Sequence, residues 1–241
     1  MSEKLIDIQG IIFDYGGTID TNGRHWAEVL WEKYKTFDVP VSKPEFREAY
    51  VYGERTLAHK QLIKPEYGFH EVLSVKTRIQ VDYLIDKGVL SRTKADEYDY
   101  ATRIADSCYR YVWDVLQRTR PVLQTLSKRY KLVLVSNFYG NIQAVLKDFG
   151  LSESFSAIIE SSVVGVRKPD PAIYQLGIDA MGFPADKVLA VGDSYPKDVV
   201  PAKHIGCRVA WLKGESWDED ANESLSDLII TDLPELLTYL L

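Results

Sequence analysis

The stretch IIFDYGGTID, residues 11–20, joins a short apolar run to an acidic residue and a glycine-rich turn. The apolar run has the character of a buried strand, and the two glycines, Gly16 and Gly17, interrupt it. Asp14 stands where the strand ends, which is the position at which open α/β sheets bind their ligands. The stretch therefore predicts a strand of a parallel sheet and a candidate reactive carboxylate, Asp14.

The second half of the chain predicts the rest of this sheet. From about residue 122 onward, apolar runs of strand length alternate with amphipathic segments of helix length. The runs are apolar on both faces, as strands of a parallel sheet are when helices cover both sides: KLVLVSN, SAIIES, KVLAVGD, RVAWLK and DLIIT. The predicted fold class is therefore α/β, with a doubly wound parallel sheet of the Rossmann type.

Between the first strand and the others lies a long segment of different character. Residues 22–116 carry helical spacing, mixed charge and many tyrosines, which is typical of a helical insertion. We expect about four helices, separated by Pro40, Pro44, Pro65 and Gly88. The predicted domains are an α/β core, residues 1–21 and 117–241, and a helical cap, residues 22–116.

Composition excludes several functional classes. A formal net charge of −6 argues against binding along a nucleic-acid backbone, although one local pocket can still attract a small anion. Cys108 and Cys207 are too few for a disulfide framework or a cysteine zinc site. No apolar run approaches the roughly 18 residues of a membrane span, and the start lacks a secretion signal. We expect a cytoplasmic protein without a membrane partner.

Four polar residues follow predicted strands in order along the chain: Asp14, Ser136, Lys168 and Asp193. Each alone is weak evidence, because an acidic residue after a strand is more often a helix cap or a turn former. The carboxyl ends of parallel strands meet at one edge of the sheet, so the four side chains are expected to converge. Their joint occurrence predicts a single site.

The motifs that carry these residues are DYGGT, LVLVSN, GVRKPDPAIY and VGDSYPKD. In this order they resemble the haloacid dehalogenase superfamily, specifically its members with a helical cap inserted after the first strand. The resemblance covers essentially the whole chain. It implies a hydrolase that acts on a small phosphorylated substrate through an aspartyl-phosphate intermediate.

The resemblance also implies roles for individual residues. Asp14 is the implied nucleophile, since an ionised carboxylate needs no base and a covalent intermediate divides one difficult displacement into two. Ser136 and the backbone amides of Gly17 and Asn137 would bind oxygens of the transferred phosphoryl group. Lys168 would supply the positive charge that holds Asp14 and the phosphate together.

An Mg²⁺ cofactor is implied by the same motifs. Asp14, Asp193 and Asp198, with the backbone carbonyl of Gly16, would form an oxygen-rich metal site. Asp198 could instead lie outside the coordination sphere and orient a metal-bound water or Lys168.

Gly16 departs from the family pattern. Family phosphatases typically carry Asp at this position, where it protonates the leaving oxygen and then activates water. General acid–base catalysis contributes about 10²–10⁴ in rate, so its loss weakens turnover without abolishing it. Asp20 and His25 are candidates for a substitute acid.

Two other functions stay open at this stage. A C-halogen or C-phosphorus hydrolase would also lack the carboxylate. The latter would use a cap lysine to form an imine, and the cap has several candidates, including Lys33, Lys43, Lys60 and Lys64. A catalytically impaired regulatory protein would keep the metal and phosphate site without turnover. Candidate substrate contacts from the cap are Arg24, His25, Arg55 and His59.

Overall fold

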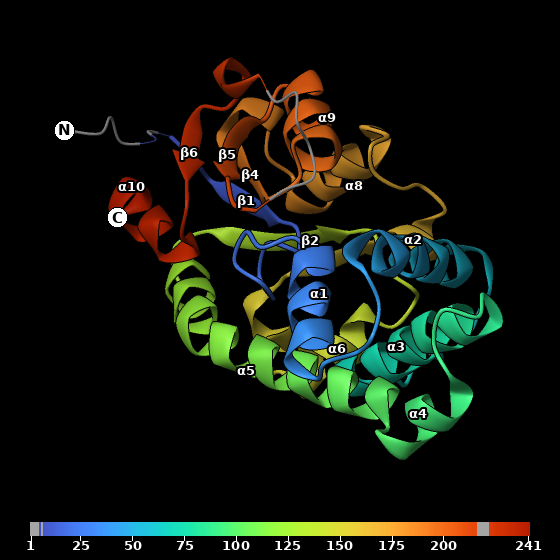
Figure 1. Ribbon diagram of the computed structural model, residues 1–241. Coiled ribbons are helices and arrows are strands. Elements are labelled where there is room, and N and C mark those ends of the chain that lie inside the picture. Colours follow the sequence, from blue (N-terminus) through green and yellow to red (C-terminus); the bar gives the residue numbers. More distant parts are fainter. Residues whose placement is uncertain (1–4, 6, 216–221) are drawn as a thin grey trace.

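The computed structural model describes residue 5 and residues 7–215 and 222–241. Its centre is a six-stranded sheet of order β3-β2-β1-β4-β5-β6, in which all neighbouring strands are parallel (Figure 1). The strands are β1 Gly10–Phe13, β2 Lys131–Ser136, β3 Ala157–Glu160, β4 Val188–Gly192, β5 Arg208–Leu212 and β6 Leu228–Ile230. The predicted α/β fold class is confirmed.

Helices cover both faces of the sheet, which explains why its strands are apolar throughout. Side chains alternate along β1, so that Ile11 and Phe13 pack on one face and Ile12 on the other, all without exposed surface. The first face packs against α5 Tyr100–Leu126, α6 Ile142–Asp148 and α10 Leu236–Leu240, and the second against α8 Ala172–Met181 and α9 Val200–His204.

Five helices lie between β1 and β2, and we call them the inserted helices: α1 Trp26–Thr36, α2 Lys43–His59, α3 Phe69–Asp86, α4 Arg92–Glu97 and α5. The sequence predicted about four. Pro44 does not separate two helices, because it lies in the first turn of α2, where a missing N–H has no consequence. The helix begins instead at a capping box formed by Ser42 and Glu45.

Helix α5, the last of the inserted helices, continues without a break to the sheet. Its first part packs against α3, and its last turns contribute Val122, Leu123 and Leu126 to the core beneath the sheet (Figure 1). The predicted domain boundary at residues 116/117 falls inside this helix, and the division into core and cap stays a prediction.

The remaining helical elements are short and lie in the loops around the sheet. They are α7 Ser161–Val164, a π-helical turn Tyr195–Val199 and 3₁₀ turns at Ser152–Ser154, Ala185–Lys187, Glu223–Leu225 and Leu233–Glu235. In the described part of the chain, no helix has the length and apolar character needed to cross a bilayer.

Candidate active site

Three acidic side chains and one lysine meet beyond the carboxyl ends of β1 and β4. Asp14 follows β1, Asp193 follows β4, and Asp198 lies in the π-helical turn. One carboxylate oxygen from each of the three lies within 4.8 Å of the others. Lys168 Nζ donates to Asp14 Oδ1 at 2.6 Å and to Asp198 Oδ1 at 2.7 Å. The structure thus brings these four predicted site residues together.

Thr18 links two of the carboxylates. Its Oγ1 lies 3.1 Å from Asp14 Oδ2 and 3.0 Å from Asp193 Oδ1, and it accepts the backbone N–H of Asp193 at 3.1 Å. A hydroxyl carries one proton and therefore donates to one carboxylate at a time. The sequence prediction assigned no role to Thr18, although it stands inside the motif DYGGT.

Asp198 is held by protein donors on both oxygens. Oδ1 accepts from Lys168 and from the Tyr174 hydroxyl at 2.7 Å, and Oδ2 accepts the Ser194 backbone N–H at 2.9 Å. Three of its about four acceptor positions are thus used, and both donors on Oδ1 hold it beside Lys168, which suits the role of orienting that lysine.

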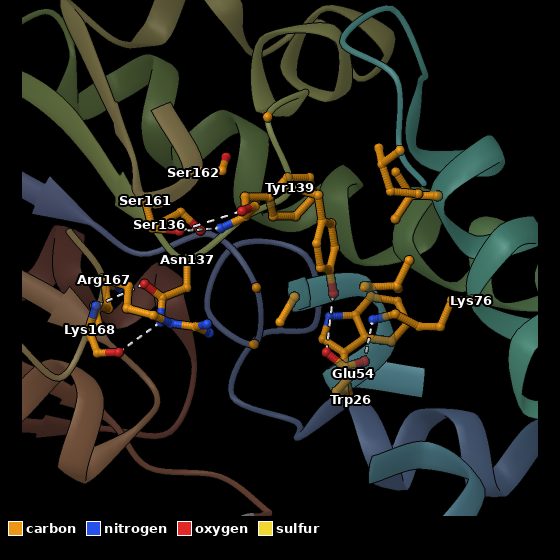
Figure 2. Close-up of a pocket in the computed structure, with 18 of the residues that line it drawn as sticks. Trp26, Glu54, Lys76, Ser136, Asn137, Tyr139, Ser161, Ser162, Arg167 and Lys168 are labelled. Carbon is orange, nitrogen blue, oxygen red and sulfur yellow. Dashed lines mark hydrogen bonds and ion pairs between the residues drawn. The ribbon is translucent and has the colours of Figure 1, made fainter. Parts of the chain in front are cut away.

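Asn137 fixes the loop that carries Lys168. Its side chain accepts the Lys168 backbone N–H at 2.9 Å and donates to the Lys168 carbonyl at 3.1 Å (Figure 2). Ser136 ends β2, is buried and lines a cavity that Asp14 and Lys168 also line. The sequence assigned the Asn137 backbone amide to phosphate binding, and the structure adds a positioning role for its side chain.

The cluster carries excess negative charge. Burial raises the pKa of Asp14 to about 6 against the opposing effect of Lys168. Burial and the charges of Asp14 and Asp198 raise the pKa of Asp193 well above its ordinary value. Burial alone would lower the pKa of Lys168, but Asp14 and Asp198 hold it above the usual range. When all three carboxylates are ionised, they carry two negative charges more than Lys168 balances, so the donor set fits a divalent cation with oxygen ligands.

The two adjacent glycines of the turn have different steric surroundings. Gly17 has a φ of +101°, and a Cβ there would lie 2.4 Å from Asp193 Oδ2. Gly16 lies outside the left-handed region, and a Cβ there would meet no atom within 4 Å. Glycine is therefore required by geometry at Gly17 and not at Gly16.

Comparison with known proteins agrees with the geometry. The haloacid dehalogenase-like hydrolase family matches residues 8–206 of the chain, which is most of its length. The chain belongs to this family.

Individual members of the family share only part of their sequence with this chain. The 5-amino-6-(5-phospho-D-ribitylamino)uracil phosphatase YigB of Escherichia coli (strain K12) is 31% identical over 150 residues, which are 62% of this chain and 61% of that enzyme. The aligned part is thus less than two thirds of the relative's length.

Two solved structures have the same fold. The HAD-hydrolase YfnB from Bacillus subtilis bound to magnesium has a TM-score of 0.60 at 17% identity, over 97% of this chain and 98% of that one. A dehalogenase in an intermediate complex has a TM-score of 0.63 at 16% identity, over 100% and 99% of the two chains. At this identity the two likenesses show the fold alone.

A cavity of about 1130 Å³ opens onto the acidic cluster of this hydrolase and extends to the inserted helices. Four of the predicted insertion residues line it: His25, His59, Lys60 and Lys64. Four others are not among its lining residues: Arg24, Lys33, Lys43 and Arg55. Arg24 forms ion pairs with Glu32 and Glu215 instead, and Lys43 pairs with Glu28.

The sequence prediction missed Lys76, which also lines the cavity. Its side chain is 9% exposed, and Nζ lies 2.7 Å from Glu54 Oε1 (Figure 2). The signal was present in the sequence, because Lys76 stands three and four residues after the buried Leu73 and Val72 on one face of α3. A charged residue on an otherwise buried face needs a partner or a ligand.

Asp20, a candidate substitute acid, is engaged on both oxygens. Oδ1 accepts the Gly17 N–H at 2.7 Å, and Oδ2 accepts the Trp26 indole N–H at 2.9 Å. Burial raises its pKa to about 7, against the effect of these two donors. The contacts fix the turn after Asp14 and connect it to α1, which is a positioning role.

Proposed function

We propose that this chain is an Mg²⁺-dependent phosphatase that acts on a small phosphorylated metabolite through an aspartyl-phosphate intermediate on Asp14. The observation that carries the proposal is the contact of the Lys168 ammonium with both Asp14 and Asp198 at the strand ends. The phosphatase activity named for the Escherichia coli relative supports it. The cavity beside Asp14 has room for a metabolite as well as for its phosphoryl group.

In the first step, an oxygen of Asp14 forms a bond to phosphorus while the bond from phosphorus to the leaving oxygen breaks. The electron pair departs on that oxygen, and water later cleaves the aspartyl phosphate to restore Asp14. Lys168 balances the charge of Asp14 and of the incoming phosphoryl group, and the Ser136 hydroxyl with the Asn137 amide binds its oxygens. The Gly17 N–H, which the sequence also assigned to phosphate binding, donates to Asp20 Oδ1 instead. The first step leaves the phosphoryl group on Asp14, and the second releases it as inorganic phosphate and returns the enzyme unchanged.

Asp14, Asp193 and the Gly16 carbonyl would hold Mg²⁺, with Asp198 outside the coordination sphere. The ion would neutralise charge that develops on the phosphoryl oxygens. Gly16 supplies no acid for the leaving oxygen, so good leaving groups, such as aryl and acyl phosphates, should be hydrolysed faster than alkyl phosphates.

The test is phosphate release from acetyl phosphate and p-nitrophenyl phosphate, with Mg²⁺ and with EDTA. We expect release only with Mg²⁺ and a loss of at least about 10³-fold in Asp14→Asn, because the nucleophile is removed. Asp186→Asn is the matched control, because Asp186 is exposed and does not line the cavity.

Other outcomes favour the other functions. Halide release from 2-chloropropionate without Mg²⁺ would favour a dehalogenase. Binding of a phosphate mimic such as vanadate with no turnover of any phosphate ester would favour a regulatory protein.

A further inference from the structure

A second polar group lines the cavity on the side of the inserted helices. It consists of Lys76 from α3, Glu54 from α2, Trp26 from the start of α1 and Tyr139 from the loop after β2, and we call it the Lys76 cluster (Figure 2). Tyr139 donates its hydroxyl proton to Glu54 Oε2 at 3.1 Å, and Lys76 contacts Glu54 Oε1. The cluster therefore combines residues of the inserted helices with one from a loop of the sheet.

Lys76 is a permanent cation in this setting. Burial alone would lower its pKa, but the Glu54 carboxylate and the Tyr139 and Tyr50 hydroxyls raise it well above the ordinary value. An ammonium has no lone pair to attack a carbonyl, so Lys76 is unsuited to form an imine. Its function must rest on charge and on hydrogen-bond donation.

The charges of the cluster do not favour a second anion on the ligand. Lys76 and Glu54 form a neutral pair, and an anion placed beside both is attracted by one and repelled by the other to a similar extent. Breaking the pair is costly, because Lys76 would be left charged and buried. A ligand that keeps the pair intact is therefore favoured.

Hydroxyl groups satisfy this condition. An ammonium offers three N–H donors and a carboxylate about four acceptor positions, so one contact between them leaves both with unused capacity. A hydroxyl can accept from Lys76 while it donates to Glu54, whose side chain is 34% exposed toward solvent. Lys76 Nζ lies over the rings of Trp26 and Tyr139, 5.8 and 5.7 Å from their centres. Both residues also line the cavity, so they place aromatic carbon beside the charged pair, where the C–H groups of a polyol can pack.

We propose that the Lys76 cluster binds the leaving-group part of the substrate and selects a hydroxyl-rich one, a phosphorylated polyol or sugar, over a plain alkyl phosphate. The inference rests on the proposed function, since it takes the phosphoryl group to lie at Asp14. Lys76 and Glu54 are the specificity-determining residues in this arrangement.

The test compares sorbitol 6-phosphate with hexyl phosphate as competitive inhibitors of p-nitrophenyl phosphate hydrolysis in the presence of Mg²⁺. The two share chain length and a primary phosphate ester, so they differ only in their hydroxyl groups. We expect the inhibition constant of sorbitol 6-phosphate to be lower by about tenfold or more, as for hydrogen bonds to charged groups. Inhibition constants are measurable even where Gly16 makes turnover of both esters slow.

Substitutions test whether Lys76 and Glu54 cause the difference between the two inhibition constants. In Lys76→Met and Glu54→Gln the ratio of the two inhibition constants should fall toward one, whereas Lys94→Met, on the exposed side of α4, should retain it. Circular dichroism and the melting temperature check that each variant folds. Where Lys76→Met does not fold, Glu54→Gln, which is nearly isosteric, carries the test alone.

Failure of the inference is distinguishable from failure of the proposed function. Hydrolysis of p-nitrophenyl phosphate with equal inhibition by both esters overturns the polyol inference and leaves the phosphatase in place. Tighter inhibition by O-phospho-L-serine than by sorbitol 6-phosphate also overturns it, because the cluster would then select a zwitterion. Absence of p-nitrophenyl phosphate hydrolysis in the presence of Mg²⁺ overturns the proposed function itself.

Discussion

Gly16 and Gly17 are adjacent in the chain, and the sequence alone cannot separate the reasons for them. The backbone at Gly17 is left-handed, and its missing side chain leaves space for Asp193. At Gly16 the backbone lies outside the left-handed region, and a Cβ would meet no atom within 4 Å. The absence of a carboxylate at Gly16 is therefore a chemical feature of the site rather than a requirement of the turn.

Gly16→Asp should fold normally and gain activity. The new side chain enters open space, so the free energy of unfolding with Mg²⁺ bound should stay within about 0.5 kcal/mol of the wild-type value. The added acid–base group should raise kcat/KM for alkyl phosphates by up to about 10²–10⁴. Steady-state kinetics on hexyl phosphate and thermal melting measure both effects.

Gly17→Ala is the matched control and should lose stability, by about 1–3 kcal/mol, because its backbone is left-handed and its Cβ meets Asp193. If Gly16→Asp folds and binds Mg²⁺ but gains nothing on alkyl phosphates, the missing carboxylate is not the limiting feature.

Asp20 should make stability depend on pH. Its pKa in the folded protein, raised to about 7 by burial, lies above the unfolded value of roughly 4. The folded state binds the Asp20 proton more tightly than the unfolded state does, and this stabilises the fold. The stabilisation is fully present below about pH 4 and is lost as the pH rises through 7, by up to about 4 kcal/mol. In EDTA, the melting temperature of the wild type should fall more steeply between pH 5 and 7.5 than that of Asp20→Asn. Parallel profiles for the two proteins would contradict this role.

At the level of elements, helix starts are set by local side chains that a sequence can reveal. Ser42 accepts from the Glu45 backbone N–H, and Glu45 accepts from the Ser42 N–H at 2.7 Å, which together form the capping box of α2. Ser91 precedes α4 in a similar position, but its side chain forms no capping hydrogen bond. The two serines offer a matched pair.

Ser42→Ala should lower the free energy of unfolding by about 1 kcal/mol, since one backbone N–H of the first turn loses its acceptor. Ser91→Ala should change it by no more than a few tenths of a kcal/mol, because no such bond exists there. Chemical denaturation of both variants measures the difference. Equal effects would mean that the capping box does not stabilise α2.

The elements also explain what the sequence could and could not predict. Asp14 and Asp193 were found because each directly follows a strand, and the ends of parallel strands converge on one edge. Lys168 lies further along, after β3 and α7, and was found through the motif that carries it. Lys76 and Glu54 lie on two helices of the insertion, and their contact depends on how those helices pack. Helical periodicity shows which residues share a face but not which faces meet. For the same reason the sequence left the choice of insertion lysine open.

In the whole molecule, the acidic cluster is a local concentration of charge that folding holds together. In the metal-free protein the carboxylates repel one another, and this repulsion together with burial raises the pKa of Asp193 well above its ordinary value. An ion that binds only the folded state stabilises it, by about 2.7 kcal/mol at a concentration of 100 times Kd.

Saturating Mg²⁺ should therefore raise the melting temperature of the wild type. Asp193→Asn should lose most of this increase, and calorimetric titration should show Mg²⁺ affinity lower by about tenfold or more. Asp186→Asn, at an exposed position, should respond to Mg²⁺ as the wild type does. An unchanged affinity in Asp193→Asn would remove Asp193 from the metal site.

Helix α5 also limits how this protein can be recombined with its relatives. The Thr119 hydroxyl donates to the carbonyl of Ile19 at 3.1 Å, so the far end of the helix is fastened to the turn that follows the nucleophile. A chimera in which residues 22–116 are replaced by those of a relative would build α5 from two different proteins, joined at the buried Leu116. Exchange points in the loops on either side, before α1 and between α5 and β2, keep the helix whole. The unit to exchange is thus all of the inserted helices, including the whole of α5. We expect substrate specificity to be transferred with that unit.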